Sequence, residues 1–125
     1  MNSVGPQVTP RLLVTRKKSD ASLKATLASG QHVFGMFNFL LDAATVEIAR
    51  LAGFDFVIID MEHSPRDWAD LAGGIRAANS YDIIPLVRVP RLDETTISQV
   101  LELGAAGIVV PFVRTAADAR RAGFD

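Results

Sequence analysis

The sequence predicts an α/β fold in which helices flank a parallel sheet. Short β-branched or apolar segments alternate four times with stretches whose apolar residues recur every three to four positions. The second apolar segment, residues 54–60, is almost continuously apolar, which is typical of a parallel strand buried on both faces. Four βα units in succession imply parallel strands joined by right-handed crossovers. An open doubly wound sheet and a barrel both fit this pattern, which does not decide between them.

The first predicted unit begins with a strand over residues 33–39. Asp42 is placed to cap a helix that extends to about residue 51, and Gly53 is expected to end it. Helical spacing predicts which side chains of this helix face the core. They are Val46, Ile48, Ala49 and Leu51.

The second unit has a strand over residues 54–60 and a helix with a clear start signal. Ser64 is placed as the N-cap, Pro65 at the first helical position, and Asp67 two residues later like a capping-box acid. One apolar stripe follows at three- and four-residue spacing. It consists of Trp68, Leu71, Ile75 and Ala78.

The third and fourth units repeat the pattern, with strands expected over residues 83–87 and 108–110. Acidic and hydroxyl residues mark the helix starts, and glycines mark the ends. The residues expected to begin or end these helices are Asp93, Glu94, Gly104, Thr115, Asp118 and Gly123. The positions expected to face inward in the third helix are Ile97, Val100 and Leu101.

Composition narrows the classes of partner. Lys and Arg total 13 and Asp and Glu total 14, so the net charge of −1 gives no reason to expect nucleic acid or an anionic membrane. No apolar run approaches the ~20 residues of a membrane span. The chain has no cysteine, which excludes disulfides, thiolate catalysis and zinc–thiolate sites. The absence of cysteine also fits a reducing compartment, so a cytoplasmic location is the expectation.

The first residues, 1–22, differ from the rest of the chain. They hold Arg11, Arg16, Lys17 and Lys18 but a single acid. A disordered, solvated tail is the expectation, and a weak organellar targeting segment is the alternative. Residues 23–125 are expected to form the folded part.

Charged side chains mark the end of the second predicted strand. Asp60, Glu62 and His63 lie on one βα turn, at the strand end where α/β enzymes gather their active sites. Histidine is the natural general base near neutral pH. The alternative interpretation is structural, because the two acids could tie down the loop and leave His63 merely exposed. The residues alone leave the two interpretations equal.

Arg88 ends the third predicted strand, directly after three apolar residues. The guanidinium group can bind a carboxylate in bidentate fashion, which suits an α-keto acid substrate. A salt bridge from Arg88 to Asp60 or Glu62 at the neighbouring strand end is the structural alternative. The two roles are compatible with each other.

Three segments carry a resemblance to a known family. Residues 52–63 (AGFDFVIIDMEH), 85–88 (PLVR) and 103–111 (LGAAGIVVP) resemble the HpcH/HpaI aldolases in order and spacing. This similarity, which runs from about residue 23 to the end, implies a (β/α)₈ TIM-type barrel. The chain would then hold the first four βα units of a truncated barrel. The resemblance also implies a metal-dependent class II aldolase that cleaves 4-hydroxy-2-oxo acids to pyruvate and an aldehyde.

The resemblance implies a role for each matching residue. His63 corresponds to the catalytic base, Arg88 to the arginine that binds pyruvate and its enolate, and Glu62 to the acid that orders metal-bound water. Asp60 corresponds to the aspartate beside them. Glu102 stands where the family pairs an aspartate with the histidine. Its place near the end of a helix puts it at the opposite rim of the barrel, so it would be a surface acid unless it acts from another subunit.

The resemblance also implies a divalent metal, Mg²⁺ or Mn²⁺, whose carboxylate ligands lie beyond residue 125. No residue of this chain is therefore assigned as a metal ligand. Asn38, at the end of the first predicted strand, is a candidate for substrate contact, although a turn-capping role is the stronger expectation.

The resemblance implies that the protein is an aldolase and that it forms a homo-oligomer. The fragment alone is expected to be inactive. A related citrate lyase or malyl-CoA lyase type of enzyme is the nearest enzymatic alternative. The alternative from another class is a truncated, non-catalytic half-barrel, since a half sheet would leave strand edges and apolar faces uncovered.

Overall fold

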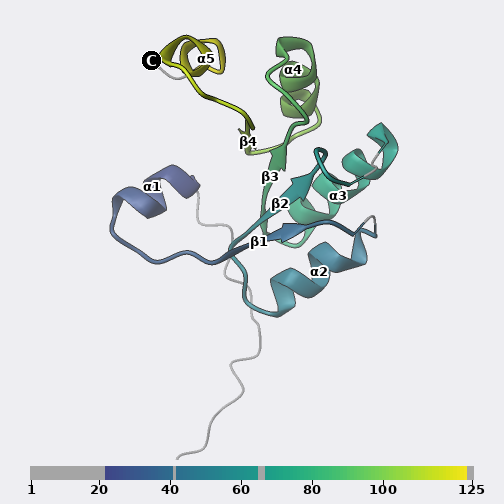
Figure 1. The fold of residues 1–125 in the computed structure, drawn as a ribbon. Helices are drawn as coiled ribbons and strands as arrows, with labels where there is room; N and C mark the ends of the chain where they lie inside the picture. The colour runs from purple at the N-terminus through teal and green to yellow at the C-terminus, as the bar shows by residue number, and fades with distance from the viewer. Residues whose placement is uncertain (1–21, 41, 65–66, 124–125) are drawn as a thin grey trace, which may run out of the picture.

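The computed structural model describes residues 22–40, 42–64 and 67–123, and it confirms the predicted α/β class (Figure 1). Its strands form one parallel sheet in the order β1-β2-β3-β4. The strands are β1 (Gly35–Asn38), β2 (Phe56–Asp60), β3 (Ile84–Arg88) and β4 (Gly107–Val109). The helices are α1 (Leu23–Ala28), α2 (Ala44–Leu51), α3 (Trp68–Ser80), α4 (Glu94–Glu102) and α5 (Ala116–Arg121).

Helix α1 is an element that the sequence pattern did not predict. The hydroxyl of Ser22 caps it by accepting a hydrogen bond from the Ala25 N–H at 3.2 Å. Figure 1 shows α1 on one side of the sheet and α2, α3 and α4 on the other. The predicted tail lies outside the described residues except for Ser22. None of the helices that the structure describes is both long and apolar enough to cross a bilayer.

The core lies between the sheet and the helices α2, α3 and α4. Val57, Ile59 and Val87 are fully buried there, and Ile59 lies so close to α3 that a Cβ on Gly74 would be 3.2 Å from its Cδ1. Alternate residues of a strand point to opposite faces, so these side chains define the helix-covered face. Helices α2, α3 and α4 contribute six residues to this cluster, and Ile83 and Val89 flank β3 within it. The six are Val46, Ala49, Leu71, Ile75, Ala78 and Val100.

The opposite side of the sheet, called here the open face, is only partly covered. Phe37, Ile58 and Leu86 stand in one row across β1, β2 and β3, and Phe37 is 41% exposed. Ile58 and Leu86 are half-buried. The expectation that the second strand is buried on both faces is therefore met only in part, because Ile58 is half-buried while Val57 and Ile59 on the other face are fully buried.

Two predicted helix starts need correction. Asp67, and not Ser64, is the N-cap of α3, because its carboxylate accepts the Asp70 N–H at 2.7 Å while the Ser64 hydroxyl bonds elsewhere. The predicted first helical residue, Pro65, lies outside the described residues. The N-cap of α2 is Ala43, and the Asp42 carboxylate accepts the Ala44 N–H from one position earlier.

The predicted apolar stripes are correct at their centres and wrong at their edges. The exposed positions lie either directly beside a buried residue or at the first or last residue of a helix, where the side chain reaches solvent. The predicted core residues that are instead exposed are Ile48, Leu51, Trp68 and Leu101. The remaining signals are confirmed: Thr115 and Asp118 form a capping box on α5, and Gly104 ends α4 with a φ of 101° that suits glycine.

Candidate functional site

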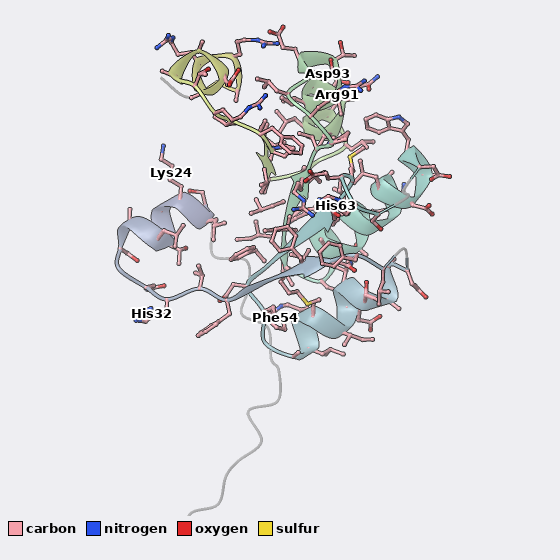
Figure 2. All side chains as sticks on the ribbon, viewed as in Figure 1. Lys24, His32, Phe54, His63, Arg91 and Asp93 are labelled. Atoms are coloured by element: carbon pink, nitrogen blue, oxygen red, sulfur yellow. The ribbon has the colours of Figure 1, made fainter. Side chains whose placement is uncertain are left out.

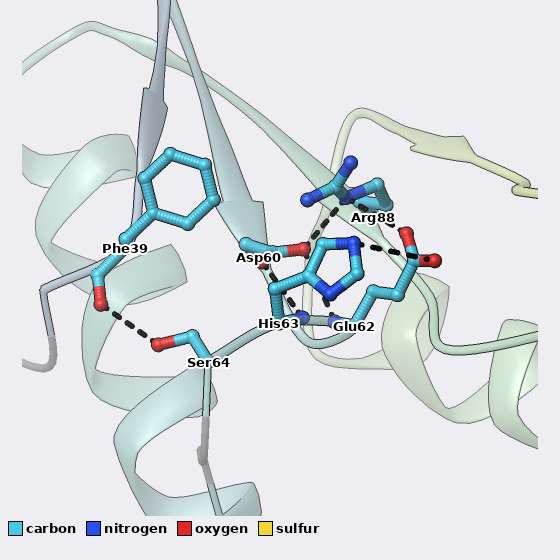
Figure 3. Close-up of polar contacts among 6 residues, drawn as sticks. All are labelled: Phe39, Asp60, Glu62, His63, Ser64 and Arg88. Carbon is cyan, nitrogen blue, oxygen red and sulfur yellow. Dashed lines mark hydrogen bonds and ion pairs between the residues drawn. The ribbon is translucent and has the colours of Figure 1, made fainter.

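Polar residues at the ends of β2 and β3, and in the turn after β2, meet at one edge of the sheet. Asp60 and Arg88 are register partners on adjacent parallel strands, and the Met61 N–H donates to the Arg88 carbonyl at 2.9 Å. Both side chains project from the open face, since Ile58 and Leu86 two residues earlier do so. Figure 3 shows Asp60, Glu62, His63 and Arg88 gathered there.

The Asp60 carboxylate organises this group. It is fully buried, and its Oδ1 accepts from Arg88 Nε at 2.7 Å and from the Glu62 N–H at 3.1 Å. Its Oδ2 accepts from the His63 N–H at 2.9 Å. One carboxylate therefore fixes both the arginine of β3 and the backbone of the turn that carries Glu62 and His63.

The electrostatics keep Asp60 and Arg88 charged. Burial, the largest single influence, raises the pKa of Asp60, but the hydrogen bonds from Arg88, Glu62 and His63 and the charge of Arg88 outweigh it, so the pKa lies below 3.8. The hydrogen bond to Asp60 raises the pKa of Arg88 further above its ordinary range, against the opposing effect of burial. The pair is thus an ion pair at neutral pH.

Glu62 and His63 extend the cluster towards solvent. Glu62 Oε2 lies 3.3 Å from Arg88 Nε, and Glu62 Oε1 lies 3.5 Å from His63 Nε2. The His63 side chain is 65% exposed, whereas that of Glu62 is 11% exposed. A histidine in this position can exchange protons with a bound molecule, while Glu62 orients its ring.

Arg88 has unused binding capacity. Its Nε is shared between Asp60 and Glu62, and within the described part of the chain its two terminal nitrogens make no hydrogen bond. The guanidinium carbon lies 4.8 Å from the centre of the Phe37 ring. The terminal N–H groups of a guanidinium fixed in this way suit a carboxylate or an enolate oxygen.

Ser64 has a different role from the predicted helix cap. Its hydroxyl is buried and donates to the Phe39 carbonyl at 2.7 Å, which joins the turn after β2 to the end of β1 (Figure 3). Sequence reasoning assigned neither this link nor the Phe37 contact. The alternation of β1 could have placed Phe37 on the face of Arg88, but strand register was not available from the pattern.

Asn38 and Glu102 do not join the cluster. The Asn38 amide donates to Thr45 Oγ1 at 2.8 Å, and its Oδ1 accepts the Leu40 N–H at 3.1 Å, contacts that favour the turn-capping interpretation. Glu102 is the exposed last residue of α4 and leads into the start of β4. It therefore lies at the opposite edge of the sheet from His63.

The other histidine is also remote. Figure 2 shows His32 on the connection between α1 and β1, well away from His63. Among the residues described here, no three His, Asp or Glu side chains gather closely enough to hold a metal ion. Because Asp60 is occupied by Arg88 and the turn, the site residues do not by themselves fit a divalent cation, which needs several oxygen ligands.

Comparisons with known proteins identify the family. The model of the HpcH/HpaI aldolase/citrate lyase family matches residues 33–123. A 4-hydroxy-2-oxovalerate aldolase of Rhodococcus jostii is 40% identical over 99 residues, which cover 78% of this chain and 38% of that protein. The chain thus spans less than half the length of the curated relatives that it matches.

Similar solved structures support the same family assignment. The citrate synthase SbnG is 44% identical, with a TM-score of 0.71 over 74% of this chain and 38% of its own. An HpcH/HpaI aldolase from Desulfitobacterium hafniense is 29% identical, with a TM-score of 0.75 over 81% of this chain and 39% of its own. These matches confirm the predicted fold class, βα units of the kind that build a (β/α)₈ barrel. The chain belongs to the HpcH/HpaI aldolase/citrate lyase family.

Proposed function

We propose that these residues form part of the active site of a carbon–carbon lyase that cleaves a 4-hydroxy-2-oxo acid to pyruvate and an aldehyde. The observation that carries the proposal is the state of Arg88: two carboxylates hold its Nε, no described residue bonds to its terminal nitrogens, and His63 belongs to the same cluster through Glu62. A 2-oxo acid offers a carboxylate and an adjacent carbonyl oxygen, the two acceptors that such an arginine can bind together. The names of family members as aldolases support the same class.

The proposed chemistry uses His63 and Arg88 in separate roles. His63 takes the proton of the C4 hydroxyl, directly or through water, and the C4 oxygen becomes the aldehyde carbonyl as the C3–C4 bond breaks. The electron pair of that bond moves to give the C2 enolate, whose negative oxygen Arg88 stabilises. Protonation of the enolate at C3 then yields pyruvate.

The divalent metal, Mg²⁺ or Mn²⁺, is part of the proposal only as an expectation from the family. The described residues do not fit it on their own, so its carboxylate ligands would come from elsewhere in the protein. No step above depends on it, and Asp60, Glu62, His63 and Arg88 keep their roles in binding, orientation and proton transfer.

A second candidate is citrate formation or cleavage. The 44% identity to a solved citrate synthase favours it. This reaction also joins an enolate to a carbonyl carbon, so Arg88 and His63 would serve it in the same way. The two candidates differ in substrate, and a comparison of pyruvate-derived and citrate-type substrates distinguishes them.

The test uses the protein expressed from its complete gene, with pyruvate and an aldehyde as substrates and Arg88→Lys as the variant. Lysine keeps the positive charge but lacks the paired N–H donors of the guanidinium group, so kcat/KM is expected to fall by more than about tenfold. Arg91→Lys, an exposed arginine after the same strand, is the matched control and should retain the wild-type value. Wild-type kcat/KM in Arg88→Lys would remove this arginine from the site.

A further inference from the structure

We propose that Phe37 is a positioning residue for Arg88: its ring supports the guanidinium plane so that the terminal nitrogens stay free for an anionic ligand. The assignment rests on the proposed function for the identity of that ligand, a 2-oxo acid. The contact itself is independent of any ligand. The guanidinium carbon of Arg88 lies 4.8 Å from the ring centre of Phe37, within the range of a cation–π interaction.

The strand register explains how these residues meet. Phe37 of β1 pairs with Ile58 of β2, and Asp60 lies two residues further along β2 on the same face. Arg88 of β3 pairs with Asp60. The arginine side chain therefore reaches across β2 to the ring on β1, so three neighbouring strands contribute to its position. Phe37 is 41% exposed, so this aromatic side chain is not merely filling the core.

A phenyl ring is suited to this task because it supports the guanidinium without accepting its strong hydrogen bonds. The carboxylates of Asp60 and Glu62 already hold the Nε edge. A third carboxylate or an amide in place of Phe37 would bind the terminal N–H groups and compete with a ligand. An aromatic face restrains the plane and leaves these donors available.

The ring is itself supported. Phe37 stacks on Phe39 with ring centroids 5.8 Å apart and an interplanar angle of 13°. The Phe39 carbonyl accepts the Ser64 hydroxyl at 2.7 Å, and Ser64 directly follows His63 (Figure 3). The aromatic pair is thus joined to the turn that carries the histidine, so Arg88 and His63 are positioned by one connected set of contacts.

The first measurement needs no ligand and follows the Arg88 Nε–H signal by NMR in the isotope-labelled protein. Phe37→Leu is expected to move this signal downfield, because the ring current is lost, and to speed its exchange with water. Phe37→Tyr should keep both properties near the wild-type values. Phe34→Leu, at an exposed phenylalanine before β1, is the matched control and should leave the signal unchanged.

The second measurement is pyruvate binding to the same proteins. Phe37→Leu should weaken it about fivefold, which corresponds to about 1 kcal/mol, and Phe37→Tyr should restore it. Failure of the wild-type protein to bind pyruvate would count against the proposed function. The NMR measurement of the Arg88 Nε–H would still test the role of Phe37.

An unchanged Arg88 Nε–H signal in a folded Phe37→Leu protein would overturn the proposal. If circular dichroism shows that this variant does not fold, the role of Phe37 is tested in the wild-type protein instead. Nuclear Overhauser contacts between the Phe37 ring and the Arg88 side chain would then support the assignment, and their absence in an assigned spectrum would reject it.

Discussion

At the scale of single residues, Asp60 is the side chain on which the site depends. It is fully buried at a sheet edge, and its three hydrogen bonds tie Arg88 to the backbone of Glu62 and His63. A buried carboxylate without such partners would cost several kcal/mol, and with them it fixes the turn and the arginine together. Changes at Asp60 should therefore affect both stability and ligand binding.

Asp60→Asn is expected to lower the free energy of unfolding by about 3 kcal/mol, because it leaves the charge of Arg88 facing a neutral amide. Urea denaturation at neutral pH measures the effect. Asp82→Asn is the control: Asp82 is exposed with a φ of 57°, which asparagine also adopts, so its loss of charge should cost little. Equal stability of the two variants would mean that the ion pair of Asp60 contributes nothing.

The lowered pKa of Asp60 predicts a pH dependence with a defined sign. In the folded protein the pKa of Asp60 lies below 3.8. The ionised carboxylate therefore stabilises the fold fully at any pH above the ordinary pKa of an aspartate. That contribution is lost as the pH falls from about 4 through the lower folded pKa. The stability difference between wild type and Asp60→Asn should therefore be largest near neutrality and shrink in acid. A difference that grows as the pH falls would contradict the assigned shift.

The positions of the polar residues at the strand ends predicted which side chains meet at one edge of the sheet. They could not predict which hydrogen bonds these side chains form. Asp60 and Arg88 end two adjacent parallel strands, and Glu62 and His63 follow the first of these strands, so their common edge follows from topology alone. Whether Arg88 serves a salt bridge or a ligand stayed open, because the answer depends on which of its nitrogens are occupied. The contribution of Phe37 depends on strand register, which a periodic pattern does not specify.

At the scale of elements, the start of α3 shows how far local sequence can predict which residue caps a helix. The pattern predicted Ser64 as the N-cap, because Pro65 suits the first helical position and Asp67 the capping-box position that follow it. Tertiary structure changes the outcome, because the Ser64 hydroxyl bonds to the end of β1 and Asp67 is left to cap α3. The centres of the helices were easier to predict, since burial there follows the helical period directly.

Asp67→Ala should cost about 1 kcal/mol of stability and speed amide exchange at Asp70, whose N–H the Asp67 carboxylate accepts at 2.7 Å. Ser64→Ala is the informative comparison. It removes a buried hydrogen bond from the histidine turn and should leave the exchange rate of the Asp70 amide unchanged. Faster Asp70 exchange in Ser64→Ala than in Asp67→Ala would restore Ser64 as the cap.

At the scale of the whole molecule, the two faces of the sheet differ in a way that bears on association. Helices bury Val57, Ile59 and Val87, whereas the open face leaves Phe37 exposed and Ile58 half-buried. The order of units predicted four parallel strands correctly, but the pattern alone could not separate a barrel from an open sheet, since both repeat the same βα unit. The family resemblance made that distinction.

A polypeptide of residues 1–125 on its own is expected to associate through the open face. At ~25 cal/mol per Å², several hundred Å² of apolar surface left in water forgoes on the order of 10 kcal/mol, comparable to the ~5–15 kcal/mol that stabilises a typical domain. Light scattering coupled to size exclusion should show dimers or larger species, and unfolding should depend on protein concentration. Phe37→Ser should weaken association, while Ile48→Ser, at an exposed position on α2, should not. A compact monomer that unfolds cooperatively and independently of concentration would show that the open face is stable in water.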